Sequence, residues 1–168
     1  MGASPALNGR IVNRGGDEGW IGKIPIRNPK GAGEIPTLDE VASGRAILER
    51  IAAEAPDSVS RGSGIARRLT AAVRASNLED GPERRRFLRA GTILGEALMH
   101  LTAAFLPETI VLAGPVSEAD EFCHGVIDGF TRAARGADSE TIEFYINRTT
   151  YLEATQRLAL FTVMTPPV

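Results

Sequence analysis

The sequence contains few of the residues that build disulfides and metal sites. Its 168 residues include one cysteine, two histidines and one tryptophan. Cys123 therefore cannot form an internal disulfide, and no second cysteine is present for a zinc knuckle or a redox pair, so a reducing cytoplasm is the expected compartment. His100 and His124 are far apart in sequence and have no further ligands beside them, so we expect structural or exposed roles for both.

Charge and hydropathy give no sign of a nucleic-acid or membrane partner. The 19 basic and 21 acidic residues leave a net charge of −2, which provides no general attraction to DNA, RNA or anionic lipid. No apolar run approaches the length of a membrane span, and the N-terminus has no signal-peptide core. The length fits one domain that can bury a core.

The first part of the chain reads as short strands and loops. Asn8-Gly9 is a two-residue turn signal, so we expect a hairpin between Pro5–Leu7 and Arg10–Val12. The apolar run Ile21–Ile26 predicts a second strand. A Gly/Pro-rich loop is expected to follow it, over Arg27–Thr37.

Helices are predicted for the middle of the chain. Ser43-Gly44 opens the first, which Pro56 closes, and a second is expected over about Ser60–Ala75. The longest starts at Asp80-Gly81-Pro82 and stops before Pro107. Its predicted buried face consists of Phe87, Leu94, Leu98, Leu101 and Phe105.

The end of the chain alternates strand and helix. Thr109–Leu112 is an unbroken β-branched and apolar run, which predicts a strand covered on both faces. Ser117, with Asp120 three residues later, is the predicted N-cap of a helix that reaches about Arg135. A strand over Thr141–Ile146 and a helix over Tyr151–Val163 are expected to follow. This alternation predicts an α/β sheet with helices packed on it.

The turn between the strand and its helix is a candidate binding site. Ala113-Gly114-Pro115 places little side chain between the strand and the free N–H groups of the helix, which suits a ligand with phosphate or a nucleotide. Ordinary strand-to-helix connections are built in the same way, and from these residues alone that interpretation is the favoured one.

Three segments carry a resemblance to a known family: EGWIGKIPI at Glu18–Ile26, TLDEVASGRAI at Thr37–Ile47 and LGEALMHLTAAFLPETIVLAGPVSEA at Leu94–Ala119. In this order and at this spacing, they resemble the ROK family of bacterial sugar kinases and sugar-responsive regulators. The first segment resembles that family's AGEIGHIPV, and the second is similar to CLEAYASGxAI. The third segment is the most specific and is similar to LGxALANLxNLLNPExIVLGGGVSEA. The resemblance spans most of the chain.

The resemblance implies an α/β fold. Residues 1–168 would form a single C-terminal lobe of the actin-like, hexokinase-like (ribonuclease H-like) ATPase fold, helix-rich with a mixed sheet, and the N-terminal lobe that holds ATP phosphates is expected to be absent. In that fold two lobes close on a sugar and ATP. Ala113, Gly114 and Pro115 then correspond to the adenosine-side turn, although Ala113 and Pro115 stand where the family has glycines, and proline removes a backbone donor.

The residues that correspond to the family's sugar-binding segments are altered. Trp20 stands where the family has a sugar-gripping Glu, and Lys23 stands where it has a His. Asp39 keeps an acid at the position of the second sugar-contacting Glu. Trp20 is either a packing residue, which is favoured, or a platform for a pyranose face. Lys23 is favoured as a surface residue, and Asp39 is equally a sugar contact or an acid stabilised by a helix dipole.

Catalysis and structural zinc are not expected from this chain alone. The phosphate-binding hairpin and the catalytic Asp belong to the family's first lobe, and no residue here matches them, so no catalytic residue is assigned. The zinc pattern CxCGxxGC falls on Lys30–Thr37, which contains no thiol. ATP remains a ligand that the resemblance implies.

Three hypotheses of function follow. The chain is a non-catalytic carbohydrate-sensing or assembly module, or it is half of an ATP-dependent sugar kinase whose first lobe is truncated or separately encoded. The third is a structural homodimer, because a lobe without its partner exposes an apolar wall. Separately, Arg84-Arg85-Arg86 lies at the wrong end of its helix for the helix dipole, which suggests a partner carboxylate or a surface contact. A solvated face is the favoured interpretation of this run.

Overall fold

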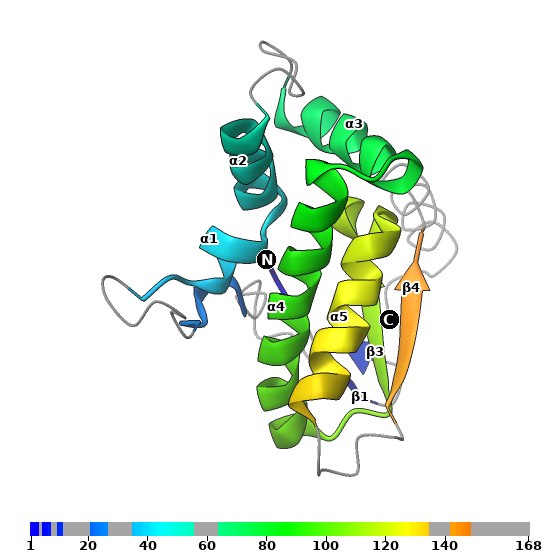
Figure 1. The fold of residues 1–168 in the computed structure, drawn as a ribbon. Helices are drawn as coiled ribbons and strands as arrows, with labels where there is room; N and C mark the ends of the chain where they lie inside the picture. The colour runs from blue at the N-terminus through cyan, green and yellow to red at the C-terminus, as the bar shows by residue number, and fades with distance from the viewer. Residues whose placement is uncertain are drawn as a thin grey trace, which may run out of the picture.

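A computed structural model describes residues 1–3, 5–7, 10–11, 21–26, 35–55, 64–134 and 142–148. Figure 1 shows α1 and α2 on one side of the long helix α4, α3 across one end of it, and α5 and the strand pair β3–β4 on the other side. The predicted helix Tyr151–Val163 lies outside the described residues. The elements in chain order are β1 (Ala6–Leu7), β2 (Arg10–Ile11), η1 (Ile21–Lys23), α1 (Leu38–Ala42), α2 (Gly44–Glu54), α3 (Ile65–Leu78), α4 (Pro82–Phe105), β3 (Thr109–Ala113), η2 (Pro115–Glu118), α5 (Asp120–Ala133) and β4 (Glu143–Asn147).

The long helix α4 begins and ends where the sequence predicts. Pro82 occupies its first turn, and the helix ends at Phe105, two residues before Pro107. Leu106 follows in the left-handed conformation, with φ 44°, and closes the helix through its N–H bond to the Thr102 carbonyl oxygen. Phe105 was expected on the buried face, and this prediction is wrong. Its side chain is 65% exposed because the last turn extends beyond the helices that cover α4.

The helices α4 and α5 lie against each other at backbone distance. A Cβ atom added at Gly91 would overlap the Phe122 carbonyl oxygen, and one at Gly95 would overlap the Val126 carbonyl oxygen. In return, Gly125 and Gly129 of α5 lie against backbone atoms of Leu88 and Thr92 on α4. The contacts advance by four residues on both helices in the same direction, so the two helices run parallel. Glycine is required at all four positions because no side chain fits between the two backbones.

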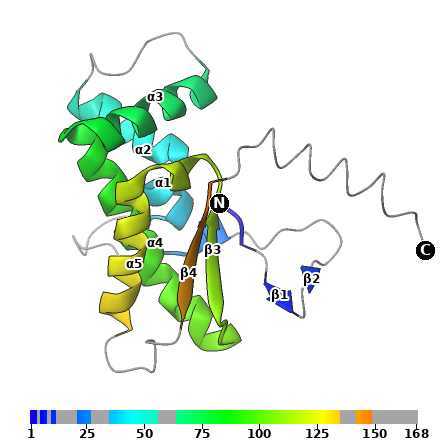
Figure 2. The ribbon, with the colours of Figure 1, turned by 90° about the vertical axis from the view of Figure 1, so that its right-hand side faces the viewer.

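The strands β3 and β4 form a parallel pair joined by α5. Thr109 pairs with Glu143 and Ala113 with Asn147, so the carboxyl ends of the two strands lie at one edge, with the start of α5. Figure 2 shows the helices on one side of this pair. The inner face, toward the helices, carries Ile110, Leu112, Phe144 and Ile146, which pack against the core. We call the other side the outer face, and it carries Thr109, Val111, Ala113, Glu143, Tyr145 and Asn147.

The prediction that the first of these strands is covered on both faces is wrong. Val111 is 57% exposed and its neighbour across the pair, Tyr145, is 63% exposed. Alternate residues of β3 point to opposite sides, so the run has one buried side and one side on which the apolar Val111 is exposed. Among the described residues, β1–β2 and β3–β4 are two separate sheets, the first antiparallel and the second parallel, so a single mixed sheet is not seen there.

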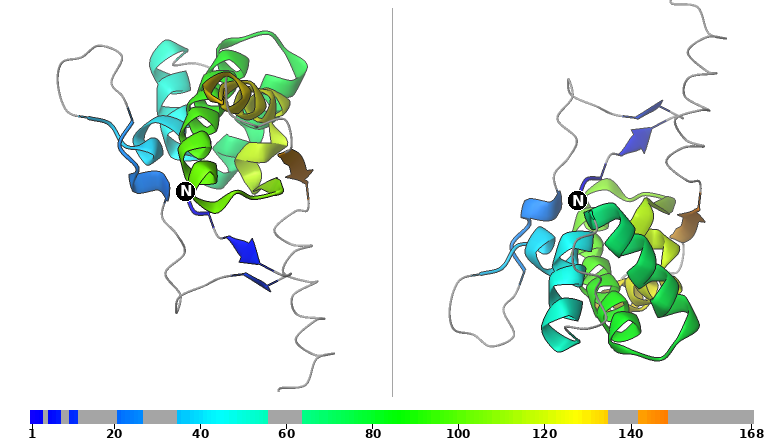
Figure 3. Two further views of the ribbon diagram at one scale, coloured as in Figure 1. Left: turned by 90° about the horizontal axis from the view of Figure 1, so that it is seen from below. Right: turned by 90° about the horizontal axis from the view of Figure 1, so that it is seen from above.

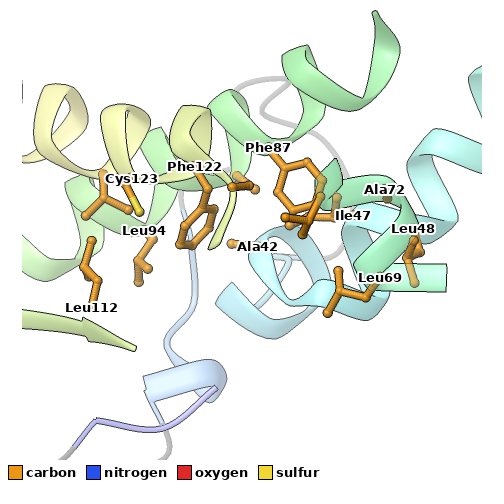
Figure 4. Close-up of a cluster of buried hydrophobic side chains, with 14 of the residues drawn as sticks. Ala42, Ile47, Leu48, Leu69, Ala72, Phe87, Leu94, Leu112, Phe122 and Cys123 are labelled. Carbon is orange, nitrogen blue, oxygen red and sulfur yellow. The ribbon is translucent and has the colours of Figure 1, made fainter. Parts of the chain in front are cut away.

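The hydrophobic core lies between α4, α5, α1–α3 and the inner face of the sheet. Figure 4 shows the buried side chains meeting from these elements, with Phe87 near Ile47 and Phe122 near Ala42. Phe87 of α4 and Val126 of α5 are fully buried. Ser43 caps α2 by accepting a hydrogen bond from the Ala46 N–H, as predicted from Ser43-Gly44.

The N-terminal segments follow the sequence predictions in part. The hairpin is confirmed, because Leu7 pairs with Arg10 and Asn8-Gly9 falls between them. Figures 2 and 3 show it projecting away from the helices. The predicted strand over Ile21–Ile26 is wrong. Its first half is the 3-10 turn η1, and Pro25 forms only an isolated bridge with Thr37, because proline cannot donate to a continuous ladder.

Candidate functional site

The candidate site lies at the carboxyl edge of β3–β4. Ala113 ends β3, and Gly114 turns the chain with φ 101°, a backbone conformation that favours glycine. Pro115 starts η2, and Ala113, Gly114 and Pro115 are all exposed. In open parallel sheets, ligands bind outside the carboxyl ends of the strands. The predicted adenosine-side turn therefore occupies the edge at which a ligand is expected.

Hydrogen bonds within the turn fix its shape. The Ser117 N–H and hydroxyl both donate to the Gly114 carbonyl oxygen, at 3.1 and 2.8 Å, and the Cys123 thiol donates to the Ser117 carbonyl oxygen at 3.1 Å. Ser117 was expected to cap α5, and this prediction is wrong. Ser117 lies inside η2, and the N-cap is Ala119, whose side chain offers no acceptor. The extra 3-10 turn moves the N-cap by two residues, from Ser117 to Ala119.

Asn77, at the end of α3, supplies the acceptor that Ala119 lacks. Its amide oxygen accepts a hydrogen bond from the Asp120 N–H at 3.0 Å, and its amide nitrogen donates to the Glu118 carbonyl oxygen at 3.0 Å. The sequence prediction ended this helix at Ala75, whereas α3 continues to Leu78. No sequence signal identified Asn77, because its two partners lie 41 and 43 residues further along the chain.

Carboxylates and their basic partners surround the start of α5. Asp120 forms an ion pair with Arg148, which follows β4, at 2.5 Å, and Glu121 pairs with Arg84 of α4 at 2.5 Å. Arg86 pairs with Glu54 of α2, so Arg84 and Arg86 have the partner carboxylates that were the less favoured interpretation of the arginine run. Carboxylates are stabilised at the positive end of a helix. Because Arg148 and Arg84 are already paired with these carboxylates, neither is free to bind a phosphate, and the edge suits the uncharged part of a nucleotide better.

Burial makes the thiol beside the turn a weak acid. Burial raises the pKa of Cys123, and the negative charge of Asp120 raises it further, while Arg148 lowers it. The side chain is buried, and its thiol is a donor to the turn. Cys123 therefore acts as a protonated hydrogen-bond donor in this part of the site and not as a thiolate nucleophile.

The residues on the predicted sugar side lie at the start of α1. Asp39 is in the first turn of this helix, and its carboxylate is 2.5 Å from the amino group of Met1. A Cβ atom at Gly22 would overlap the Asp39 carboxylate, so η1 packs directly on this side chain. Lys23 is exposed at the end of η1. Trp20 lies outside the described residues.

The sugar side and the turn meet at the junction of α1 and α2. A Cβ atom at Gly44 would be 3.2 Å from a methyl group of Val116 in η2 and 3.0 Å from a methyl group of Leu69 in α3. Val116 therefore rests on the backbone where α2 begins, five residues after Asp39. This contact explains the glycine of the ASG segment: a side chain there would press on the turn.

Metal binding has no support in the described part of the chain. Among those residues no group of three or more His, Cys, Asp and Glu side chains could hold a metal ion. His100 is exposed, and His124 lies 3.9 Å from the carboxylate of Glu121.

None of the described helices combines the length and the apolar character needed to span a membrane.

Comparisons with solved structures bear on the fold. No protein-family model and no curated protein matches the sequence. A ROK hexokinase from Thermus thermophilus superposes with TM-score 0.65 and 24% identity over 95% of this chain and 54% of its own. A ROK family glucokinase from Streptomyces griseus, in complex with glucose and AMPPNP, superposes with TM-score 0.64 and 21% identity, over 86% of this chain and 51% of the glucokinase. A ROK family transcriptional regulator, a homolog of E. coli MLC protein, superposes with TM-score 0.70 and 22% identity, over 92% of this chain and 40% of the regulator.

These likenesses confirm the resemblance at the level of the fold. The chain has a helix-rich α/β fold that matches about half of each kinase chain, consistent with one lobe of the hexokinase-like fold. It spans 40 to 54% of the length of the three structures.

Proposed function

We propose that this chain is a ROK-type lobe that binds a sugar and the adenosine part of a nucleotide without phosphorylating the sugar by itself, and acts as a carbohydrate-sensing or assembly module. The observation that carries the proposal is the contact of Val116 with Gly44. It joins the exposed turn at the carboxyl edge of the sheet to the segment of Asp39. The segment that resembles the family's nucleotide side therefore contacts, through Gly44, the segment that resembles its sugar side, which supports the proposal.

The chemistry of the edge supports binding without phosphoryl transfer. Transfer of a phosphoryl group needs a positioned base for the sugar hydroxyl and cations or donors for the phosphates. The arginines near the start of α5, Arg148 and Arg84, are paired with Asp120 and Glu121, so neither is free to bind a phosphate. Pro115 has no N–H to offer a phosphate oxygen. Sugar hydroxyls, in contrast, can be bound by a partly exposed carboxylate such as Asp39.

Calorimetric titration tests the proposal. The purified chain is titrated with glucose, N-acetylglucosamine, ADP and ATP, and a coupled assay measures sugar phosphorylation. We expect binding of a sugar and of both nucleotides with similar affinity, and no phosphorylation. Asp39→Asn is expected to weaken sugar binding about tenfold by removing a charge-assisted hydrogen bond. The matched control is Glu49→Gln, an exposed carboxylate of α2 that pairs with Arg45. ATP-dependent phosphorylation by this chain alone would refute the proposal.

A second function is favoured by the length of the match. The chain spans 54% and 51% of the hexokinase and the glucokinase, and its outer face leaves Val111 and Tyr145 uncovered. Both facts fit one half of an ATP-dependent sugar kinase whose other lobe is a separate polypeptide. Sequencing of the adjacent DNA and co-expression with any neighbouring frame that encodes a DxGxT segment tests this. Phosphorylation that requires both polypeptides would replace the first proposal.

A structural homodimer would cover the same outer face. Exposed apolar pairs such as Val111 and Tyr145 are commonly buried by association. Light scattering and sedimentation of the wild type and of Tyr145→Ser distinguish the cases. If the wild type is a monomer, the homodimer hypothesis is refuted. If the wild type is a dimer and Tyr145→Ser is a monomer, the hypothesis is supported.

A further inference from the structure

Asn77 joins α3 to both sides of the junction between η2 and α5. Its amide donates to the carbonyl oxygen of Glu118 and accepts from the N–H of Asp120, each at 3.0 Å. One planar amide thus binds two backbone groups that lie two residues apart. A side chain can bind both groups only if it carries a donor and an acceptor close together, and the asparagine amide carries both. Asn77 is not in any of the segments that resemble the ROK family.

Hydrogen bonds within the turn fix its shape, and Asn77 fixes the position of its far end relative to α3. Gly114 has φ 101°, and Ala119 offers no side-chain cap for α5. Without Asn77, the Asp120 N–H at the first position of α5 would lose its acceptor. The middle of the turn is held separately, by Val116, which rests on Gly44 at the start of α2. Asn77 therefore holds the far end of the turn, and both supports come from α2 and α3.

We propose that Asn77 is a positioning residue that sets the place of the Gly114–Glu118 turn for nucleotide binding. It does not touch the nucleotide. It acts through the two backbone groups that it holds, and the inference rests on the proposed function, because the turn is taken to bind the adenosine side of the nucleotide.

The test compares Asn77→Ala with the wild type in ADP affinity, by calorimetry, and in amide hydrogen exchange at Asp120. We expect the Kd for ADP to rise about tenfold from the loss of two hydrogen bonds, with sugar affinity unchanged. We expect the Asp120 amide to exchange about tenfold faster, because its acceptor is gone. Arg74→Ala is the matched control, since Arg74 is an exposed residue one turn earlier on α3 and should leave all three quantities unchanged.

Asn77→Asp separates the two bonds. The carboxylate keeps an acceptor for the Asp120 N–H but cannot donate to the Glu118 carbonyl oxygen. We expect slow exchange at Asp120 to be retained and the Kd for ADP to rise by only about threefold. A purely structural role would lower the melting temperature of both variants without changing the Kd of the folded protein. This variant also decides the matter if Asn77→Ala does not fold, because an unchanged Kd would then overturn the inference.

The outcomes distinguish this inference from the proposed function. If the wild type binds no ADP, the proposed function fails, and a role in nucleotide binding fails with it, whatever the exchange at Asp120 shows. If the wild type binds ADP and Asn77→Ala binds it equally well, the proposed function stands and the inference about Asn77 is overturned.

Discussion

The helix pair α4–α5 and the strand pair β3–β4 are linked in sequence and packed in opposite ways. The helices meet through four glycines, with no room for a methyl group between their backbones. The strands bury their inner face and leave Val111 and Tyr145 on the outer face mostly exposed. Among the described residues, the helix pair is closely packed, whereas the sheet leaves the outer face exposed. Stability is therefore expected to reside in the helices, and recognition in the sheet and its carboxyl edge.

The sharpest way to break this comparison is to enlarge a glycine between the helices. Gly95→Val adds three carbon atoms where even a Cβ would overlap the Val126 carbonyl oxygen. We expect a loss of about 3 kcal/mol or more in unfolding free energy, measured by chemical denaturation. Gly64→Ala is the control, because no atom lies within 4 Å of a Cβ built there. Equal effects of the two substitutions would show that the helices do not pack as closely as described.

Substitutions at two neighbouring residues of β3 compare how much each face of the sheet contributes to stability. Leu112→Ala removes a buried side chain from the inner face, so we expect a cost of about 2.5 kcal/mol in unfolding free energy. Val111→Ala removes an exposed side chain from the outer face, so we expect a change within about 0.5 kcal/mol. Urea denaturation of both variants measures the difference. A cost at Val111 as large as that at Leu112 would mean that the outer face is covered in solution.

The connection between the two regions carries a strained residue. Leu106, between α4 and β3, has φ 44° and is 82% exposed. Asparagine tolerates this left-handed conformation better than leucine, so Leu106→Asn should raise the melting temperature and stabilise the protein by about 1 kcal/mol. Leu106→Ala removes the same exposed side chain without relieving the backbone. A similar gain from Leu106→Ala would attribute the effect to surface hydropathy and not to φ.

The smallest expected effect concerns Cys123, on the buried side of α5. Its pKa is raised above that of an exposed thiol, chiefly by burial. The folded state therefore holds the proton more tightly than the unfolded state. The resulting contribution to stability is complete below the ordinary thiol pKa and is lost as the pH rises toward the raised value. Thermal melts from neutral to alkaline pH should show a slightly smaller decline for Cys123→Ala than for the wild type. An identical decline would contradict the shift.

The rate at which Cys123 is alkylated measures how often α5 opens to solvent. Because Cys123 is buried and protonated, alkylation of the native protein should be slow and should accelerate in denaturant. Fast alkylation in native buffer would indicate that α5 opens readily, and the contrast between the helices and the sheet would then weaken.

Several parts of the fold were predictable because their signals are local. Pro82 and Pro107 delimit α4, Ser43 caps α2, and Asn8-Gly9 separates the two strands of the hairpin. Each signal acts through backbone groups within a few residues, so no distant contact is needed to read it. The turn at Ala113-Gly114-Pro115 was found for the same reason.

Other parts could not be read because they depend on distant neighbours. Ser117 has the residue type of an N-cap, yet the helix starts three residues later, where Asn77 provides the acceptor. Nothing in the sequence distinguishes the exposed Val111 from the buried Leu112, because both are apolar residues in one strand. Phe105 fits the helical periodicity but lies beyond the helices that would bury it.

The sequence by itself determined the bounds of α4, the cap of α2 and the hairpin turn, because capping, proline and turn chemistry act between residues that are close along the chain. Only the tertiary structure decided which glycines face a neighbouring backbone, which side of the sheet is covered, and which residue holds the turn. The physical reason is that these contacts join residues tens of positions apart, such as Asn77 and Asp120 or Gly44 and Val116. Their partners are set by packing of the whole chain and not by any local preference.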